Sequence, residues 1–163
     1  MEQRPKRKPT RLPTFDYNGI GTYFLTLCTK EKRCTLGQVS SAANETECPT
    51  IQLSPIGILI ENQIQTMAQF YAAVSVDHFV IMPNHVHLLL SVCEERSNTT
   101  PANAAIPMFI SALKRFSNKQ AGENLWQRSY HDHIVRNEQD YLRIWQYIDT
   151  NASKWEADCF YQA

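Results

Sequence analysis

The sequence lacks a long apolar run, a closely spaced pair of cysteines and any net charge, and each absence excludes a class of protein. No stretch approaches the roughly 18 apolar residues of a membrane-spanning helix, so we expect no membrane partner. The basic N-terminal segment contains no apolar core, which argues against a secretory signal. Without a CxxC pair, a cysteine-based zinc site is not expected.

The five cysteines are odd in number and far apart, a pattern typical of free thiols in the reducing cytosol. We therefore predict a cytoplasmic protein. A length of 163 residues favours one domain that can bury its own core. Hydrophobic residues make up 43% of the chain, which argues against wholesale disorder.

The zero net charge conceals an uneven distribution. Residues 1–12 hold five basic residues and one acidic residue, so the remaining chain is mildly acidic. A basic arm suggests a phosphate-rich partner, although a solvated terminus is the simpler interpretation of the charge alone. We divide the chain into a basic N-terminal arm, 1–12, and a single domain, 13–163.

Hydrophobic patterning predicts four strands and three helices. The predicted strands cover 22–29, 76–82, 85–92 and 129–136, and the predicted helices cover 55–71, 106–120 and 137–151. Ser54 and Asn137 are the expected N-caps, and the polar stretches 40–48 and 94–104 are expected loops. The order predicts an α+β fold, namely a ferredoxin-like βαββαβ antiparallel sheet with an additional C-terminal helix.

Two histidines in the third predicted strand are the sharpest local feature. His85 and His87 are two residues apart, so both imidazoles point to the same face of the strand. Val86 and Leu88 point to the other face. The pair could hold a divalent ion, or it could be two polar residues on a half-exposed sheet.

The last predicted helix offers partners for this pair. Its apolar stripe includes Tyr141, which is expected in the core, whereas Arg143, Tyr147 and Asn151 follow one another at four-residue spacing along a polar row. A surface tyrosine beside an apolar stripe is the alternative interpretation of Tyr147.

A tyrosine, two imidazoles and an amide are together suited to phosphodiester transfer. A phenol has a pKa of about 10 and needs a nearby cation when it attacks a phosphate. Imidazole nitrogen with amide oxygen suits Mg²⁺ or Mn²⁺, and Zn²⁺ stays open as an alternative.

The chain resembles the IS200-like single-tyrosine transposases of the His-hydrophobic-His superfamily, especially the REP-associated tyrosine transposase branch. Matching stretches run in family order over about 11–157: RLPTFDYNGIGTYFLTLCT, FVIMPNHVHLLL, LWQRSYHDHIVRNEQD and YIDTNASKW. The resemblance implies a metal-dependent enzyme that nicks and rejoins single-stranded, hairpin-associated DNA through a 5′-phosphotyrosine, and hence a nucleoid-associated protein. Relatives are monomers or dimers, so a homodimer is one of two expectations.

By this resemblance, Tyr147 is the nucleophile, and His85, His87 and Asn151 are the metal ligands. The family pattern continues with proline after the asparagine, whereas this chain has Ala152. The helix therefore need not stop there, which would hold Asn151 less firmly. A domesticated module that binds hairpin nucleic acid without cutting it is the alternative function, and a small-molecule or metal-binding protein is a more distant one.

Basic residues in the arm, the second long helix, the last strand and the last helix are the expected DNA contacts. These are Arg11, Lys114, Arg115, Arg128, His133, Arg136 and Arg143. For Lys114 and Arg115, a solvated helix face is an equally good interpretation, and His133 could be a structural histidine.

Overall fold

The structure, a computed structural model, describes residues 19–40, 48–94 and 104–161. Four antiparallel strands form the main sheet in the order β4-β5-β1-β6. They are β1 (Gly21–Cys28), β4 (Val74–Met82), β5 (His85–Val92) and β6 (His131–Val135). The two central strands, β5 and β1, are the ones flanked by neighbours on both edges.

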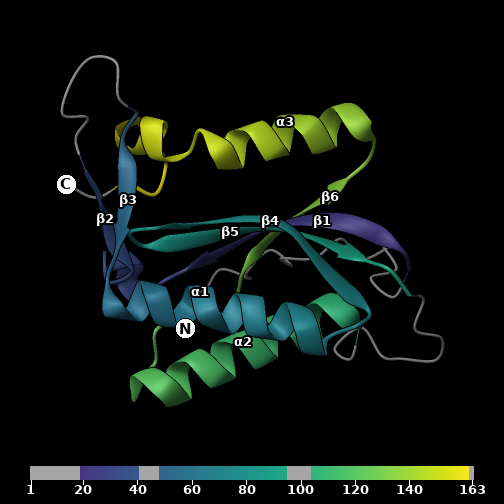
Figure 1. The fold of residues 1–163 in the computed structure, drawn as a ribbon, viewed down its shortest axis with the longest axis horizontal. Helices are drawn as coiled ribbons and strands as arrows, with labels where there is room; N and C mark the ends of the chain where they lie inside the picture. Colours follow the sequence, from purple (N-terminus) through teal and green to yellow (C-terminus); the bar gives the residue numbers. More distant parts are fainter. Residues whose placement is uncertain (1–18, 41–47, 95–103, 162–163) are drawn as a thin grey trace, which may run out of the picture.

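Helices cover both faces of this sheet (Figure 1). Helices α1 (Pro55–Phe70) and α2 (Ala105–Ala121) lie together on one face, and α3 (Glu138–Asp149) lies on the other. Each of the first two helices connects strands that are separated by one intervening strand in the sheet. This is the ferredoxin-like arrangement, so the predicted fold and its additional C-terminal helix are confirmed.

The predicted N-caps begin their helices as expected. The Ser54 hydroxyl accepts a hydrogen bond from the backbone N–H of Gly57 at 3.1 Å. The Asn137 side chain accepts from the backbone N–H of Asp140 at 2.8 Å. These oxygens satisfy N–H groups that have no partner within the helix, and acidic residues in the first turn of α3 complement its dipole.

The alternation of side chains along the sheet produces two hydrophobic clusters. Val86, Leu88 and Leu90 point to the face covered by α1 and α2 and are fully buried in the large core. A smaller cluster on the opposite face joins Leu89 to Ile144 and Ile148 of α3. The sheet is therefore covered on both sides, but on the α3 face β5 contributes a single apolar residue, Leu89, beside His85, His87 and Ser91.

A second, two-stranded sheet is formed by β2 (Gly37–Ser40) and β3 (Thr50–Leu53), and the sequence pattern did not predict it. Strands of four residues are too short for a clear alternation pattern. Short 3₁₀ turns, η1 (Lys30–Lys32) and η3 (Ala152–Ala157), were also not predicted. In the described part of the chain, no helix is long and apolar enough to cross a membrane.

Several predicted features lie outside the described residues. These are the basic arm with Arg11, the central part of the loop at 40–48 and most of the loop at 94–104. The remaining predicted elements agree with the structure to within a few residues. The last strand and the last helix are each shorter than predicted.

Helix α1 packs against the chain before β2 so closely that residue 57 must be glycine. A Cβ built on Gly57 would lie 2.0 Å from the carbonyl oxygen of Leu36. We expect Gly57→Ala to lower the free energy of unfolding by about 2 kcal/mol, although alanine favours helix by about 1 kcal/mol over glycine. Urea unfolding followed by circular dichroism measures this, with the exposed Gln65→Ala in the same helix as control. Equal or greater stability of Gly57→Ala would contradict the close packing.

Candidate active site

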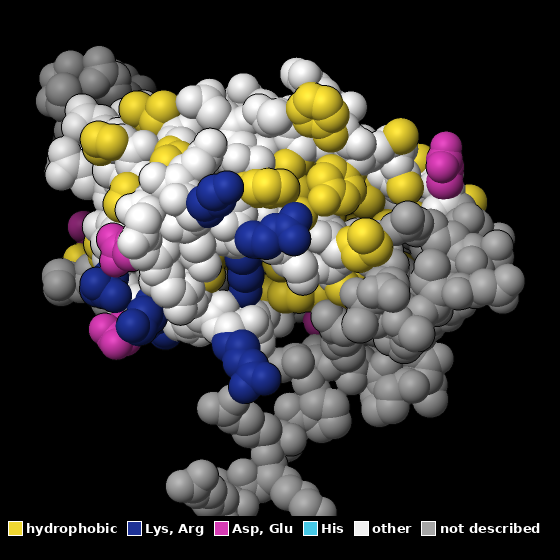
Figure 2. All heavy atoms as spheres, turned by 90° about the horizontal axis from the view of Figure 1, so that it is seen from below, with side chains coloured by type: hydrophobic (Ala, Val, Ile, Leu, Met, Phe, Trp, Pro, Cys, Tyr) yellow, Lys and Arg dark blue, Asp and Glu magenta, His cyan; other side chains and the backbone are white. Residues whose placement is uncertain are grey.

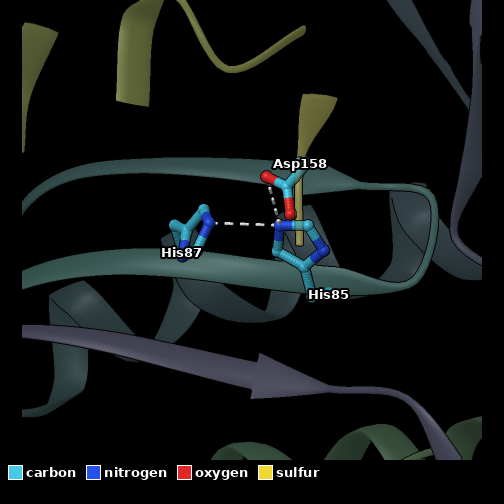
Figure 3. Close-up of side chains that lie close together, drawn as sticks. All are labelled: His85, His87 and Asp158. Carbon is cyan, nitrogen blue, oxygen red and sulfur yellow. Dashed lines mark hydrogen bonds and ion pairs between the residues drawn. The ribbon is translucent and has the colours of Figure 1, made fainter. Parts of the chain in front are cut away.

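The structure brings the two imidazoles of β5 together on the sheet face that α3 covers. The Nε2 atoms of His85 and His87 lie 3.1 Å apart, and the two side chains are 0% and 1% exposed. Figure 3 shows both rings rising from β5 toward residues 152–161, which we call the C-terminal segment. The predicted common face is confirmed, whereas the alternative of a half-exposed sheet face is wrong because the C-terminal segment covers the rings.

Hydrogen bonds at Nδ1 of each ring orient both imidazoles. The Asn84 amide nitrogen donates to the carbonyl oxygens of Lys32 and Phe160, so its Oδ1 is left to accept from Nδ1 of His85 at 2.9 Å. His85 therefore carries its proton on Nδ1 and turns the Nε2 lone pair inward. Nδ1 of His87 lies 2.9 Å from the Thr26 hydroxyl, which can donate or accept.

Both imidazoles are neutral near pH 7. Burial, with a smaller contribution from Lys32, lowers the pKa of His85 to about 3. Burial and then the neighbouring His85 lower the pKa of His87 to about 3, although the Asp158 carboxylate acts in the opposite direction. Neutral imidazole is the form that binds a metal ion, so the pair is ready to act as ligands at physiological pH.

Tyr147 of α3 lies beside the imidazoles, on the sheet face that α3 covers. Its hydroxyl lies 3.4 Å from Nε2 of His87, and its ring packs edge-on against Phe24 with centroids 5.9 Å apart. Burial raises the pKa of Tyr147 and the Asp158 carboxylate raises it further, whereas the Asn151 amide lowers it. The phenol therefore stays protonated at neutral pH unless a positive charge lies nearby.

Apolar packing and one hydrogen bond between His78 and Asp149 hold α3 on the sheet. Ile144 and Ile148 pack on Leu89, with Tyr141 and Trp145 beside them. His78 of β4 lies 2.6 Å from the Asp149 carboxylate and stacks on Trp145 with centroids 4.3 Å apart. Tyr141 thus belongs to the packed stripe, as its position in the sequence predicted. These contacts turn Tyr147 toward the imidazoles.

Asn151 follows the end of α3 and is fully buried. The helix ends at Asp149 even without the proline of the family pattern, and Asn151 opens the η3 turn. Within the described chain, Oδ1 of Asn151 has no hydrogen-bond partner, and Nδ2 has none of ordinary geometry, although the amide lies near enough to the Tyr147 hydroxyl to lower its pKa. Leaving a buried amide unpaired costs about 1–3 kcal/mol per group, so the Asn151 amide is suited to an additional ligand.

A carboxylate that was not expected from the sequence also lies at this site. Oδ2 of Asp158, which follows η3, lies 4.0 Å from Nε2 of His85 (Figure 3). The same oxygen lies 3.5 Å from the Tyr147 hydroxyl. The side chain is only 3% exposed. No pattern marks Asp158 in the sequence because it lies beyond the last periodic helix, in a segment whose path depends on tertiary packing.

Three of the expected DNA contacts gather near the N-terminus of α3. His133 and Arg143 both bond to the Asp140 carboxylate, and Arg136 is exposed beside them. The Arg143 guanidinium, followed by His133, lowers the pKa of Asp140 to about 2. These residues line an open hollow of about 460 Å³, and its basic groups are partly neutralised by Asp140.

The other expected contacts are placed differently. The Lys114 ammonium donates to the carbonyl oxygens of Gln127 at 2.8 Å and Ser129 at 2.9 Å, so it holds the chain that leads into β6. Arg128 is exposed in this segment, and Arg115 is exposed on α2. Figure 2 shows Lys and Arg side chains among hydrophobic ones on the face of α1 and α2, across the sheet from the imidazoles.

Comparison with known proteins identifies a relative and two similar structures. An uncharacterised protein of Haemophilus influenzae is 30% identical, over 95% of this chain and 93% of its own length. The structure of a REP-associated tyrosine transposase bound to a REP hairpin is 18% identical, covers 94% of this chain and 73% of that one, and has a TM-score of 0.57. A candidate transposase from Deinococcus radiodurans is 22% identical, over 89% and 96% of the two chains, with a TM-score of 0.49. No protein-family model matches the sequence.

The Thr26 hydroxyl is the partner that holds the His87 ring. Replacing it by a methyl group leaves a buried ring nitrogen unpaired while the shape is kept. We expect Thr26→Val to lower the free energy of unfolding by about 1–3 kcal/mol, measured in urea with EDTA present. Thr26→Ser keeps the hydroxyl and should lose less. A Thr26→Val protein as stable as the unmodified one would show that the hydrogen bond is not needed.

Proposed function

The chain belongs to one family with the Haemophilus influenzae protein and has the fold of the REP-associated tyrosine transposase, and from its site we propose that it cleaves and rejoins single-stranded DNA. Tyr147 is the proposed nucleophile, and a hairpin-associated strand is the proposed substrate. The neighbouring structure holds a REP hairpin, which supports this choice of substrate.

The proposal rests above all on the position of the Tyr147 hydroxyl. It lies 3.4 Å from Nε2 of His87, which in turn faces Nε2 of His85 at 3.1 Å. A phenol beside two imidazoles whose Nε2 atoms face one another is an arrangement for placing a nucleophile next to a cation. All of these groups come from one chain.

The residues present fit a divalent cation. His85 and His87 offer neutral nitrogens, and the buried Asn151 oxygen has no partner among the described residues. We propose these three as ligands of Mg²⁺ or Mn²⁺. When bound, such an ion polarises a non-bridging oxygen of the attacked phosphate.

In the proposed reaction, the Tyr147 oxygen attacks phosphorus and the bond from phosphorus to the 3′ oxygen breaks. The phenol loses its proton and the leaving 3′ oxygen gains one, so the step is balanced. The products are a 5′-phosphotyrosine and a 3′-hydroxyl end. Attack by a 3′-hydroxyl on the phosphotyrosine reverses the step and rejoins a strand without an external energy source.

A phosphate can reach the imidazoles only after a rearrangement of their cover. Both rings are buried, and the Phe160 ring lies over His85 with centroids 4.7 Å apart. This closure is the observation that favours the second candidate function, binding of hairpin nucleic acid without cleavage. The intact pairing of Tyr147 with His87 favours the enzyme.

The nucleophile is tested by trapping a covalent protein–DNA adduct on a labelled hairpin oligonucleotide with Mn²⁺. We expect Tyr147→Phe to abolish the adduct because the attacking oxygen is missing. Tyr141→Phe, which removes a hydroxyl from the same helix outside the site, is the control and should keep it. An adduct with Tyr147→Phe would assign the wrong nucleophile, and hairpin binding without any adduct from the unmodified protein would favour the binding module.

The hollow beside α3 is tested by the salt dependence of hairpin binding. We propose that Arg136 contacts a phosphate there, so Arg136→Ala should weaken binding and reduce the slope of log K against log salt by about one. Lys119→Ala, at the end of α2, is the matched control for loss of one positive charge. Equal slopes for both variants would show that the DNA does not pass Arg136.

A further inference from the structure

The C-terminal segment places a nearly buried carboxylate at the edge of the imidazole pair. One donor atom each from Asp158, His85 and His87 lies within 4.8 Å of the others. Ligands that are adjacent in the shell of an ion bound at about 2.1 Å are about 3 Å apart. The two imidazole nitrogens already have this separation, and Oδ2 of Asp158, 4.0 Å from His85, needs a shift of about 1 Å.

Among the described residues, no lysine or arginine nitrogen lies within 4.0 Å of the Asp158 carboxylate. Its Oδ2 lies 4.0 Å from Nε2 of His85 and accepts from the Tyr147 hydroxyl at 3.5 Å. The other carboxylate oxygen, Oδ1, accepts from the backbone N–H of Phe160 at 2.7 Å. A carboxylate that is 3% exposed therefore faces the two imidazoles with few hydrogen-bond donors around it, and a cation between the three side chains would stabilise this arrangement.

Other carboxylates near α3 are satisfied elsewhere. Asp149 is half exposed and pairs with His78, and Asp140 bonds to His133 and Arg143 at the far end of the helix. Asp158 is thus the carboxylate that the fold directs to the site.

We propose that Asp158 is a further ligand of the divalent cation in the DNA-free protein, beside His85 and His87. This inference rests on the proposed function for the existence of the metal site. It adds a charged oxygen to a set of neutral donors, which strengthens binding and favours the hard ions Mn²⁺ and Mg²⁺.

The test measures Mn²⁺ affinity without DNA, by electron paramagnetic resonance of the free aqueous ion. Asp158→Asn keeps the size of the side chain and the oxygen that accepts from Phe160, but removes the charge. We expect its Mn²⁺ affinity to fall at least tenfold. Glu156→Gln, an exposed acidic residue of the same segment, is the matched control and should stay within twofold.

A His87→Ala variant separates this inference from the proposed function. If His87→Ala loses Mn²⁺ binding and Asp158→Asn stays within twofold of the unmodified protein, the metal site stands and the role of Asp158 is refuted. If the unmodified protein binds no Mn²⁺, or if His87→Ala binds it unchanged, the metal site itself is refuted.

Thermal unfolding distinguishes a loss of Mn²⁺ binding from a folding defect in these variants. The Mn²⁺-dependent rise in Tm is compared with the EDTA baseline of the same variant, so a general loss of stability cancels. We expect a smaller rise for Asp158→Asn than for Glu156→Gln. An equal rise in the two variants would overturn the proposal.

Discussion

The structure depends on strand β5 being buried on both faces. Its side chains alternate between the large core under the sheet and the smaller cluster under α3. A shift in pairing by one residue would put the imidazoles into the apolar core and the leucines into the site. Pairing on both edges prevents this shift, because His85 is opposite Cys28 of β1 and Met82 of β4. The packing of the hydrophobic core therefore fixes which face of the sheet the two histidines occupy.

Burial gives these imidazoles their chemical character. Away from water, the charged form is disfavoured, and the pKa of each falls to about 3. The hydrogen bond to Asn84 then sets which nitrogen of His85 carries the proton. Asn84 also donates to carbonyl oxygens of η1 and the C-terminal segment, so three distant parts of the chain meet at one side chain. Such indirect contacts orient the groups that bind a metal ion.

Much of the fold could be predicted because its patterns are local. The four strands of the main sheet and the three helices follow from periodicity, and Ser54 and Asn137 mark helix starts by their side-chain chemistry. The β2–β3 sheet could not be predicted in the same way, because each of its strands is four residues long. The predicted role of Lys114 in DNA binding remains untested, and its bonds to backbone carbonyl oxygens could not have been foreseen from a helix pattern.

The sequence by itself determined which residues share a face: His85 with His87 on a strand, and Tyr147 apart from Tyr141 on a helix. This follows because the strand and helix periods place side chains without reference to the rest of the chain. Tertiary structure decided that these two faces meet, that the meeting point is closed to water, and that Asp158 joins it. Those outcomes depend on how α3 and the segment after it pack across the sheet, and packing between residues far apart in the chain leaves no periodic signal in the sequence.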